Sequence, residues 1–188
     1  RPKFAILNPE LTYTLPPYQT ASGCVDIMSH TLERYFSDGG DVMLTDGIAE
    51  ALLKTIMVMS KRALENPEDY EARANIMWAG SLSHNNLTGS GRGMGGRAGD
   101  WASHQLEHEL SGMYDVAHGA GLAVVFPAWM RYVYKHDVKR FVQFATRVWD
   151  VDPTGKSDEE IALEGIQAMQ NFFISLGMPA TLEQAGGR

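Results

Sequence analysis

The stretch GDWASHQLEHELSGMYDVAHGAGLAVVFP, which runs from Gly99 to Pro127, is the most informative part of this chain. It contains His104, His108 and His118, which are half of the six histidines in the sequence. Residues four positions apart lie on the same face of an α-helix, so His104 and His108 point in one direction. His118 follows Gly112, where the helix could end and the chain could turn back. Three imidazoles in this pattern predict a metal site or a proton-transfer site.

Helices joined by tight loops are predicted over almost all of the chain after residue 16. The proline pair at residues 16–17 favours the first turn of a helix that continues to about residue 36. This helix would place Asp26 and His30 on one face. The sequence Ser157–Glu160 matches a capping box, which marks the start of the last predicted helix. Besides the opening stretch, the other expected helices cover residues 45–66, 69–86, 119–134, 137–149 and 157–176.

Two local features qualify this all-α prediction. The apolar run Phe4–Leu7 is predicted to be a buried strand or the remnant of one. Pro127 is predicted to kink or stop the helix over residues 119–134, because proline lacks the N–H that an interior helical position needs. We therefore expect a helical bundle preceded by a short N-terminal extended segment.

Composition excludes several classes of function. The chain has 188 residues, 44% of them hydrophobic, which suits one ordinary domain with a substantial core. Its net charge of −7 disfavours nucleic acid or an anionic membrane as a partner, because both require clustered Lys and Arg. No apolar run reaches the ~20 residues of a membrane helix. Cys24 is the only cysteine, so no intrachain disulfide can form and a reducing, cytoplasmic location is expected.

One interpretation of the histidines is a zinc hydrolase. The run His104-Gln-Leu-Glu107-His108 matches the pattern H-x-x-E-H, in which both histidines bind zinc and the glutamate activates water. The motif is short and leaves Asp26, His30 and His118 without a role, although one of them could be the third zinc ligand.

A second interpretation recruits residues from two parts of the chain. Asp26 and His30 on one helix, with His104 and His118 from the opening stretch, would supply three imidazoles and one carboxylate. This donor set, which has no thiolate, suits Fe(II), Zn, Co or Ni. His108 would then face the cleft beside the metal without binding it.

A third interpretation treats the histidines as structural, in a non-catalytic helical interaction domain.

The glycine-rich run Gly91-x-Gly93-x-x-Gly96 nominally fits a dinucleotide fingerprint. That fingerprint binds pyrophosphate only between a strand and a helix, and here a predicted helix precedes it. The run is better explained as a loop at the edge of a cleft.

Three segments together resemble the iron-containing alcohol dehydrogenase family. They are NPELTYTLPP at residues 8–17, TASGCVDIMSHTLERYF at residues 20–36, and GDWASHQLEHELSGMYDVAHGAGLAVVFPAWMRY at residues 99–132. The resemblance extends from Lys3 to about Ala180 and is strongest to the butanol-dehydrogenase-like branch. It implies a helical bundle of the dehydroquinate synthase-like type. It also implies reduction of small aldehydes, or oxidation of primary alcohols such as butanol, with NAD(P)(H) as cofactor and a homodimeric full-length enzyme.

The resemblance also assigns roles to residues. His108 would lie beside the nicotinamide and relay protons, and the T-x-L-P segment would pass near the same ring. A divalent metal, Fe2+ or Zn2+, would be held by the G-x-x-D-x-x-x-H helix and two later histidines. The implied metal ligands are Asp26, His30, His104 and His118, and the implied cofactor contacts are His108, Leu11, Thr14 and Leu15.

Domain organisation follows from the same resemblance. Residues 1–16 would be an extended segment at the junction with an N-terminal nucleotide-binding domain that this chain lacks. Residues 17–188 would be the helical metal-binding domain, truncated at its C-terminus. The chain would then keep its metal ligands but lack turnover by itself, because half of the cofactor site is absent.

Overall fold

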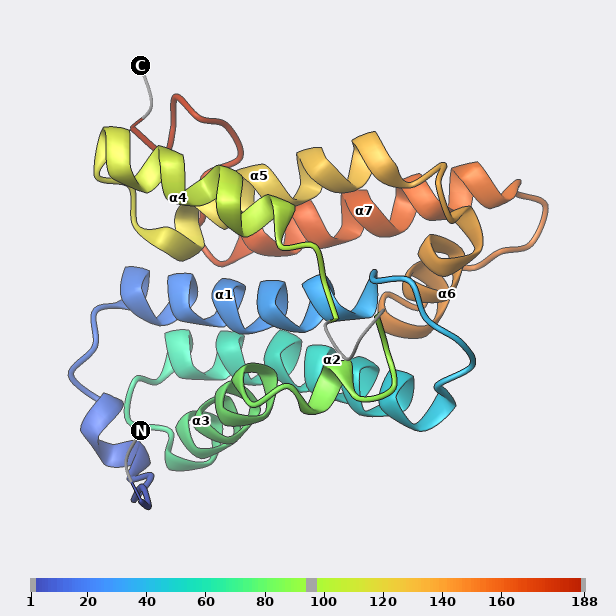
Figure 1. The fold of residues 1–188 in the computed structure, drawn as a ribbon. Helices are drawn as coiled ribbons and strands as arrows, with labels where there is room; N and C mark the ends of the chain where they lie inside the picture. Colours follow the sequence, from blue (N-terminus) through green and yellow to red (C-terminus); the bar gives the residue numbers. More distant parts are fainter. Residues whose placement is uncertain (1–2, 94–97, 187–188) are drawn as a thin grey trace.

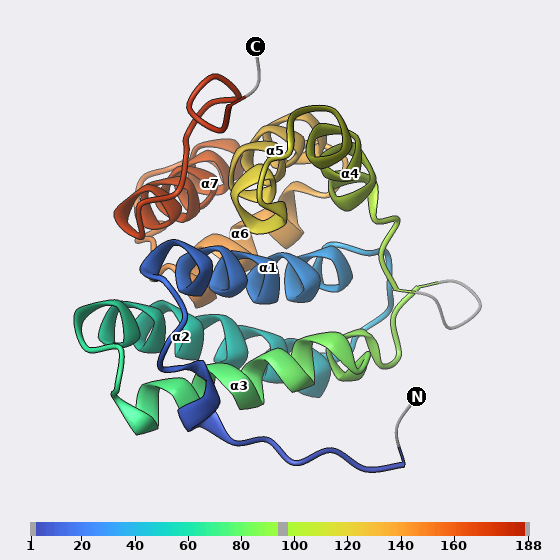
Figure 2. The ribbon, with the colours of Figure 1, turned by 90° about the vertical axis from the view of Figure 1, so that its left-hand side faces the viewer.

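Helix α1, Pro17–Tyr35, lies in the middle of the structure, with α2 and α3 on one side and α4, α5 and α7 on the other (Figures 1 and 2). The computed structural model describes residues 3–93 and 98–186. Gly96 of the glycine-rich run lies outside these residues. Within them the regular structure is helical, and the β-structure is one isolated bridge between Gly39 and Arg92. The other helices are η1 Pro9–Thr12, α2 Met43–Glu65, α3 Tyr70–His84, η2 Leu87–Gly89, α4 Ala102–Tyr114, α5 His118–Val133, α6 Val138–Val148 and α7 Asp158–Ser175.

The central position of α1 explains its composition. Most of its residues are buried, including small ones such as Ala21, Cys24 and Ser29. A helix that is covered on nearly all sides cannot show a clean polar face. α6, at the periphery, does show one, with Phe141 and Phe144 on its buried stripe. The predicted all-α bundle is therefore confirmed.

Local signals fix several helix ends. Asp69 caps α3 by accepting the Ala72 N–H at 3.0 Å. Ser157 and Glu160 form the reciprocal capping box expected from the sequence, at the start of α7. These side chains bind backbone N–H groups that have no partner inside the helix.

Three local predictions differ from the structure. Phe4 and Ile6 are 78% and 84% exposed and form no strand, because no neighbouring strand in the described residues can pair with them. α4 passes through Gly112 and ends at Tyr114, and Asp115, which caps it, has a φ of 55°. The predicted stop at Pro127 does not occur, since α5 continues to Val133. Pro127 lies on the buried face, where packing outweighs the lost hydrogen bond.

A carboxylate at the start of α2 ties three segments together. Asp46 is buried and receives two hydrogen bonds of 2.7 Å from the Arg140 guanidinium of α6. Arg92, which precedes α4, forms an ion pair with the same carboxylate. The Arg140 guanidinium also lies over the Tyr35 ring, 3.6 Å from its centroid. Asp46 is therefore a carboxylate shared by one buried and one partly buried guanidinium group.

The contact between α1 and α5 leaves no room for a side chain at Gly119. A Cβ placed there would overlap the Ser22 carbonyl of α1. Gly119→Ala is therefore expected to destabilise the chain by about 1–3 kcal/mol, because the helices would have to separate. Gly23→Ala is the matched control, since a Cβ there meets nothing within 4 Å. It should stabilise the helix by up to about 1 kcal/mol. Urea unfolding of both variants measures the difference, and equal effects would contradict the overlap.

None of the helices in residues 3–93 and 98–186 is both long and apolar enough to cross a bilayer.

Candidate metal centre

The side chains of Asp26, His30, His104 and His118 meet where α1 faces the starts of α4 and α5. Asp26 and His30 project from α1, His104 comes from α4, and His118 is the first residue of α5. The Nε2 atoms of the three histidines lie close to one oxygen, Oδ1 of Asp26. Their distances from it are 3.6 Å for His30, 3.7 Å for His104 and 3.3 Å for His118.

These separations suit a shared metal ion. Bonds of about 2.1 Å at tetrahedral angles place neighbouring ligand atoms about 3.4 Å apart. Within the described residues, three sets of donors have their atoms within 4.8 Å of one another, and two of them contain Asp26: Asp26–His104–His118 and Asp26–His30–His84. Both sets share the Asp26 carboxylate, which makes it the central ligand.

His104 is oriented from behind by a buried glutamate of α1. The Oε1 atom of Glu33 lies 2.9 Å from Nδ1 of His104 and also accepts hydrogen bonds from the Ser103 hydroxyl and the His104 N–H. The Glu33 side chain is 1% exposed. Because a carboxylate only accepts, Nδ1 of His104 carries the hydrogen. The Nε2 lone pair is thereby turned toward Asp26.

His118 is oriented in the same way by a glutamate of α4. Glu107 is fully buried and its carboxylate binds Nδ1 of His118 and the hydroxyl of Ser111. Gly121 makes room for this carboxylate, since a Cβ there would overlap it. The contacts close a ring through three helices: α1 orients His104 of α4, α4 orients His118 of α5, and both imidazoles face Asp26 on α1.

The centre is left with buried atoms that need a positive charge. Neither Oδ1 of Asp26 nor Nε2 of His104 has a hydrogen-bond partner, although both are buried. Two lone pairs that face each other at 3.7 Å repel unless a proton or a metal ion lies between them. Carboxylate-backed histidines around one further carboxylate are typical of metal sites. These residues therefore fit a divalent ion.

The pKa values show how strongly the centre attracts a cation. Burial would raise the pKa of Asp26, but contacts with His104, His118 and His84 hold it far below its usual range. Burial would lower the pKa of His104, but Asp26 and Glu33 outweigh this and raise it to about 9. Asp26 also raises the pKa of His118. Burial lowers the pKa of His30 to about 3, so its ring is neutral at neutral pH.

His108 lies at the rim of the centre. Its exposed ring is 5.1 Å from the His118 ring and 6.5 Å from the His104 ring, measured between centroids. In the described residues, no donor set unites His104 with His108, although Glu107 and His108 form a set with His118. Glu107 is engaged by His118 and Ser111 instead of facing open water. This geometry favours the Asp26 set over the H-x-x-E-H interpretation.

The predicted cofactor contacts from the N-terminal segment lie before or at the entry to α1. Leu11, Thr14 and Leu15 are all exposed, Leu11 by 78% and Leu15 by 43%. An exposed position leaves each of them free to contact a ligand.

Sequence reasoning missed Glu33 and His84. Glu33 lies seven positions after Asp26, two turns along the same helix, so the spacing was a usable signal for a carboxylate on that face. No motif pointed to His84, because the end of α3 reaches Asp26 only through the packing of α3 on α1. Glu107 was identified, but as a base for water.

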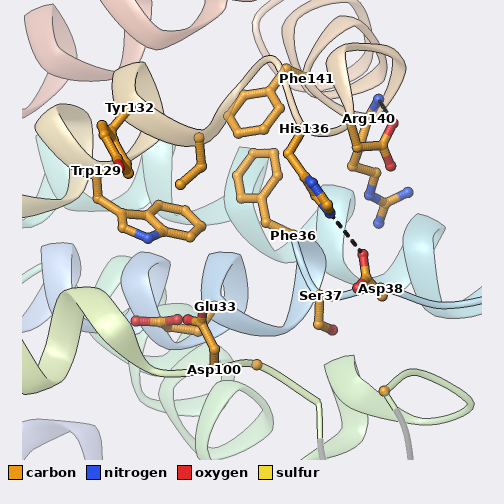
Figure 3. Close-up of a pocket in the computed structure, with 14 residues that line it drawn as sticks. Glu33, Phe36, Ser37, Asp38, Asp100, Trp129, Tyr132, His136, Arg140 and Phe141 are labelled. Atoms are coloured by element: carbon orange, nitrogen blue, oxygen red, sulfur yellow. Dashed lines mark hydrogen bonds and ion pairs between the residues drawn. The ribbon is translucent and has the colours of Figure 1, made fainter.

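Glu33 also borders a cavity of about 660 Å³ between the ends of α1 and α5 and the start of α6 (Figure 3). Aromatic rings form much of its wall, and Phe36 and Phe141 stack with centroids 4.3 Å apart. None of the four predicted metal ligands lines it. The candidate metal centre is therefore separate from this cavity, and Glu33 borders both.

Glu107→Ala is expected to lower the affinity of the chain for Zn2+ by about 10–100-fold. The reason is that His118 would lose the acceptor that fixes its ring, and second-shell losses of this kind have that size. Glu109→Ala, which changes an exposed glutamate of the same helix, is the control and should leave the affinity unchanged. Competition with a chromophoric chelator measures both. Equal affinities would show that His118 needs no support.

Comparisons with known proteins agree with this geometry. The family model described as "Fe-containing alcohol dehydrogenase family, C-terminal" matches residues 20–188. The chain is 46% identical to NADH-dependent butanol dehydrogenase A of Clostridium acetobutylicum, over 99% of this chain and 46% of that protein. It is 42% identical to the NADPH-dependent aldehyde reductase YqhD of Escherichia coli, again over 99% and 46%. The crystal structure of NADH-dependent butanol dehydrogenase A from Thermotoga maritima superposes with a TM-score of 0.92 at 45% identity, covering 100% of this chain and 45% of that one. The chain thus spans less than half the length of these relatives.

Proposed function

This chain belongs to the Fe-containing alcohol dehydrogenase family, and we propose that it is the metal-binding domain of an NAD(P)-dependent alcohol dehydrogenase or aldehyde reductase. The observation that carries the proposal is the set of three imidazole Nε2 atoms 3.3–3.7 Å from one oxygen of Asp26. The relatives named for butanol dehydrogenase and aldehyde reductase activities support the reaction class. In this proposal residues 17–188 form the domain and residues 1–16 lead into it.

The metal ligands in this proposal are Asp26, His30, His104 and His118. Imidazole nitrogens and a carboxylate oxygen, with no thiolate, suit Fe2+ or Zn2+. When bound, such an ion supplies Lewis acidity toward the oxygen of an alcohol or aldehyde.

The remaining chemistry falls to residues around the ligands. Glu33 and Glu107 keep the imidazole rings of His104 and His118 in one tautomer and one orientation. His108, exposed at the rim, can exchange a proton between the reacting oxygen and solvent, a role that suits histidine near neutral pH. Hydride transfer itself belongs to the nicotinamide, and the protein orients the reactants.

The proposal extends to the cofactor, the substrates and the assembly. NADH or NADPH would contact His108 and the exposed residues Leu11, Thr14 and Leu15, and the substrates would be small primary alcohols such as butanol and their aldehydes. The names of the relatives support both the nucleotide and the substrates. A homodimeric, cytoplasmic enzyme completes the proposal on the family resemblance alone.

Metal binding and hydride transfer test the proposal separately. The 188-residue chain, purified without a histidine tag, should bind one divalent ion per chain. The whole protein that carries it should oxidise NADH or NADPH with butanal, lose that activity to a chelator and regain it with Fe2+ or Zn2+. The chain alone should not reach that rate. A chain with no affinity for Fe2+, Zn2+ or Co2+ would refute the proposal, as would full turnover by the chain without the rest of the protein.

A further inference from the structure

His84, the last residue of α3, reaches the metal centre from a helix that carries none of the four ligands named above. Its ring stacks on the His30 ring with centroids 3.8 Å apart and 24° between the planes. Its Nε2 lies 3.4 Å from Oδ2 of Asp26, the oxygen opposite the one that faces His104 and His118. Oδ1 therefore faces the Nε2 atoms of His30, His104 and His118, and Oδ2 faces that of His84.

The orientation of His84 is fixed from behind, as it is for His104 and His118. Nδ1 of His84 lies 2.9 Å from the Gly80 carbonyl oxygen and 2.7 Å from the Ser83 hydroxyl. A carbonyl oxygen only accepts, so Nδ1 carries the hydrogen and donates it. Nε2 is left with its lone pair directed at Asp26. His30 differs, because its Nδ1 is buried without a partner.

We propose that Asp26, His30 and His84 form an outer position for the divalent ion, beside the inner position at Asp26, His104 and His118. The two donor sets each lie within 4.8 Å internally and share the Asp26 carboxylate. His84 is the most exposed of the five side chains, at 43% against 5% for His104, so the outer position is the one that opens to solvent.

One ion, not two, occupies the pair of positions. A single carboxylate lies between them, and repulsion from a first divalent ion would cancel the attraction of that one negative charge for a second. His84 is thus a donor to that ion when the ion lies at the outer position, together with Asp26 and His30. This inference rests on the proposed metal site and adds a residue to it.

Cobalt binding tests the outer position directly. In the double variant His104→Ala/His118→Ala, the outer donors remain, so the chain should still bind Co2+, more weakly than the unchanged chain. Adding His84→Ala should lower the remaining affinity by at least about tenfold, because a ligand is lost. Adding His136→Ala instead should change nothing, since that histidine is 80% exposed and pairs with Asp38. Isothermal titration measures all four affinities, and circular dichroism checks that each variant is folded.

A second measurement uses the otherwise unchanged chain, in case the multiple variants fail to fold. The ring N–H of a histidine that binds Co2+ gives a strongly shifted proton NMR signal, whereas a histidine that only hydrogen-bonds to Asp26 does not. His84→Ala should remove one such signal and His136→Ala none. The same number of shifted signals in His84→Ala, or equal Co2+ affinity with and without His84 in the double variant, would overturn the outer position. If the unchanged chain binds no Co2+ at all, the proposed metal site fails as well.

Discussion

Asp26→Ala is expected to lower the affinity of the chain for Zn2+ or Co2+ by more than about 100-fold. Oδ1 of Asp26 is the atom to which all three imidazole nitrogens converge, at 3.3–3.7 Å. The variant would leave neutral imidazoles with no anionic ligand among them. Loss of a residue that merely supports a ligand costs about 10–100-fold, so loss of the central ligand should cost more. A titration with a competing chelator at fixed pH gives the value.

His108→Ala is the control for this prediction. His108 lies at the rim and belongs to neither donor set that contains Asp26. Replacing it should therefore change the metal affinity of the chain only slightly. A zinc hydrolase built on His104, Glu107 and His108 requires the opposite result, with metal lost from His108→Ala and kept by Asp26→Ala. The two variants therefore separate the dehydrogenase from the hydrolase in one experiment.

Asp46→Ala is expected to destabilise the chain by about 3–5 kcal/mol, because it leaves one buried and one partly buried guanidinium group without their shared carboxylate. Arg140 binds Asp46 through two hydrogen bonds of 2.7 Å, and Arg92 pairs with it from another segment. For a domain of this length, the loss corresponds to a fall in Tm of roughly 10 °C.

Asp41→Ala, which removes an exposed aspartate just before α2, is the matched control for Asp46→Ala. It should change the free energy of unfolding by no more than about 0.5 kcal/mol. Chemical unfolding followed by circular dichroism measures both variants. A loss below about 1 kcal/mol for Asp46→Ala would show that the arginines find other partners or reach solvent.

The sequence was sufficient to predict the helical architecture because its signals are local. The proline pair before α1, the Ser157 cap of α7 and the apolar periodicity of α6 each act within a few residues. Pro127 and Gly112 are also local signals, yet neither ends its helix. At Pro127 the burial of the surrounding face outweighs the lost backbone hydrogen bond, and packing of that kind depends on residues far along the chain.

The candidate metal centre also had a part that the sequence could predict and a part that it could not. Asp26 with His30, and His104 with His108, were visible as helical pairs, and the donor chemistry joined Asp26, His30 and His104 to His118 before the family resemblance supported the same set. The residues that orient the ligands were harder to find, because Glu33 and His104 are 71 positions apart and meet only in the folded chain. Burial of a glutamate cannot be read from its own neighbours in sequence. The supporting carboxylates therefore required the structure.

The contact of Gly119 with α1 holds the start of α5, and with it His118, against the helix that carries Asp26. These two residues are far apart in the chain, yet Nε2 of His118 lies 3.3 Å from Oδ1 of Asp26. An ion held by both would act as a cross-link that closes a very long loop, and the entropy cost of closing such a loop falls on the unfolded chain. Folding and metal loading should therefore be thermodynamically linked, so that a chain saturated with metal resists unfolding in proportion to the logarithm of the free metal concentration.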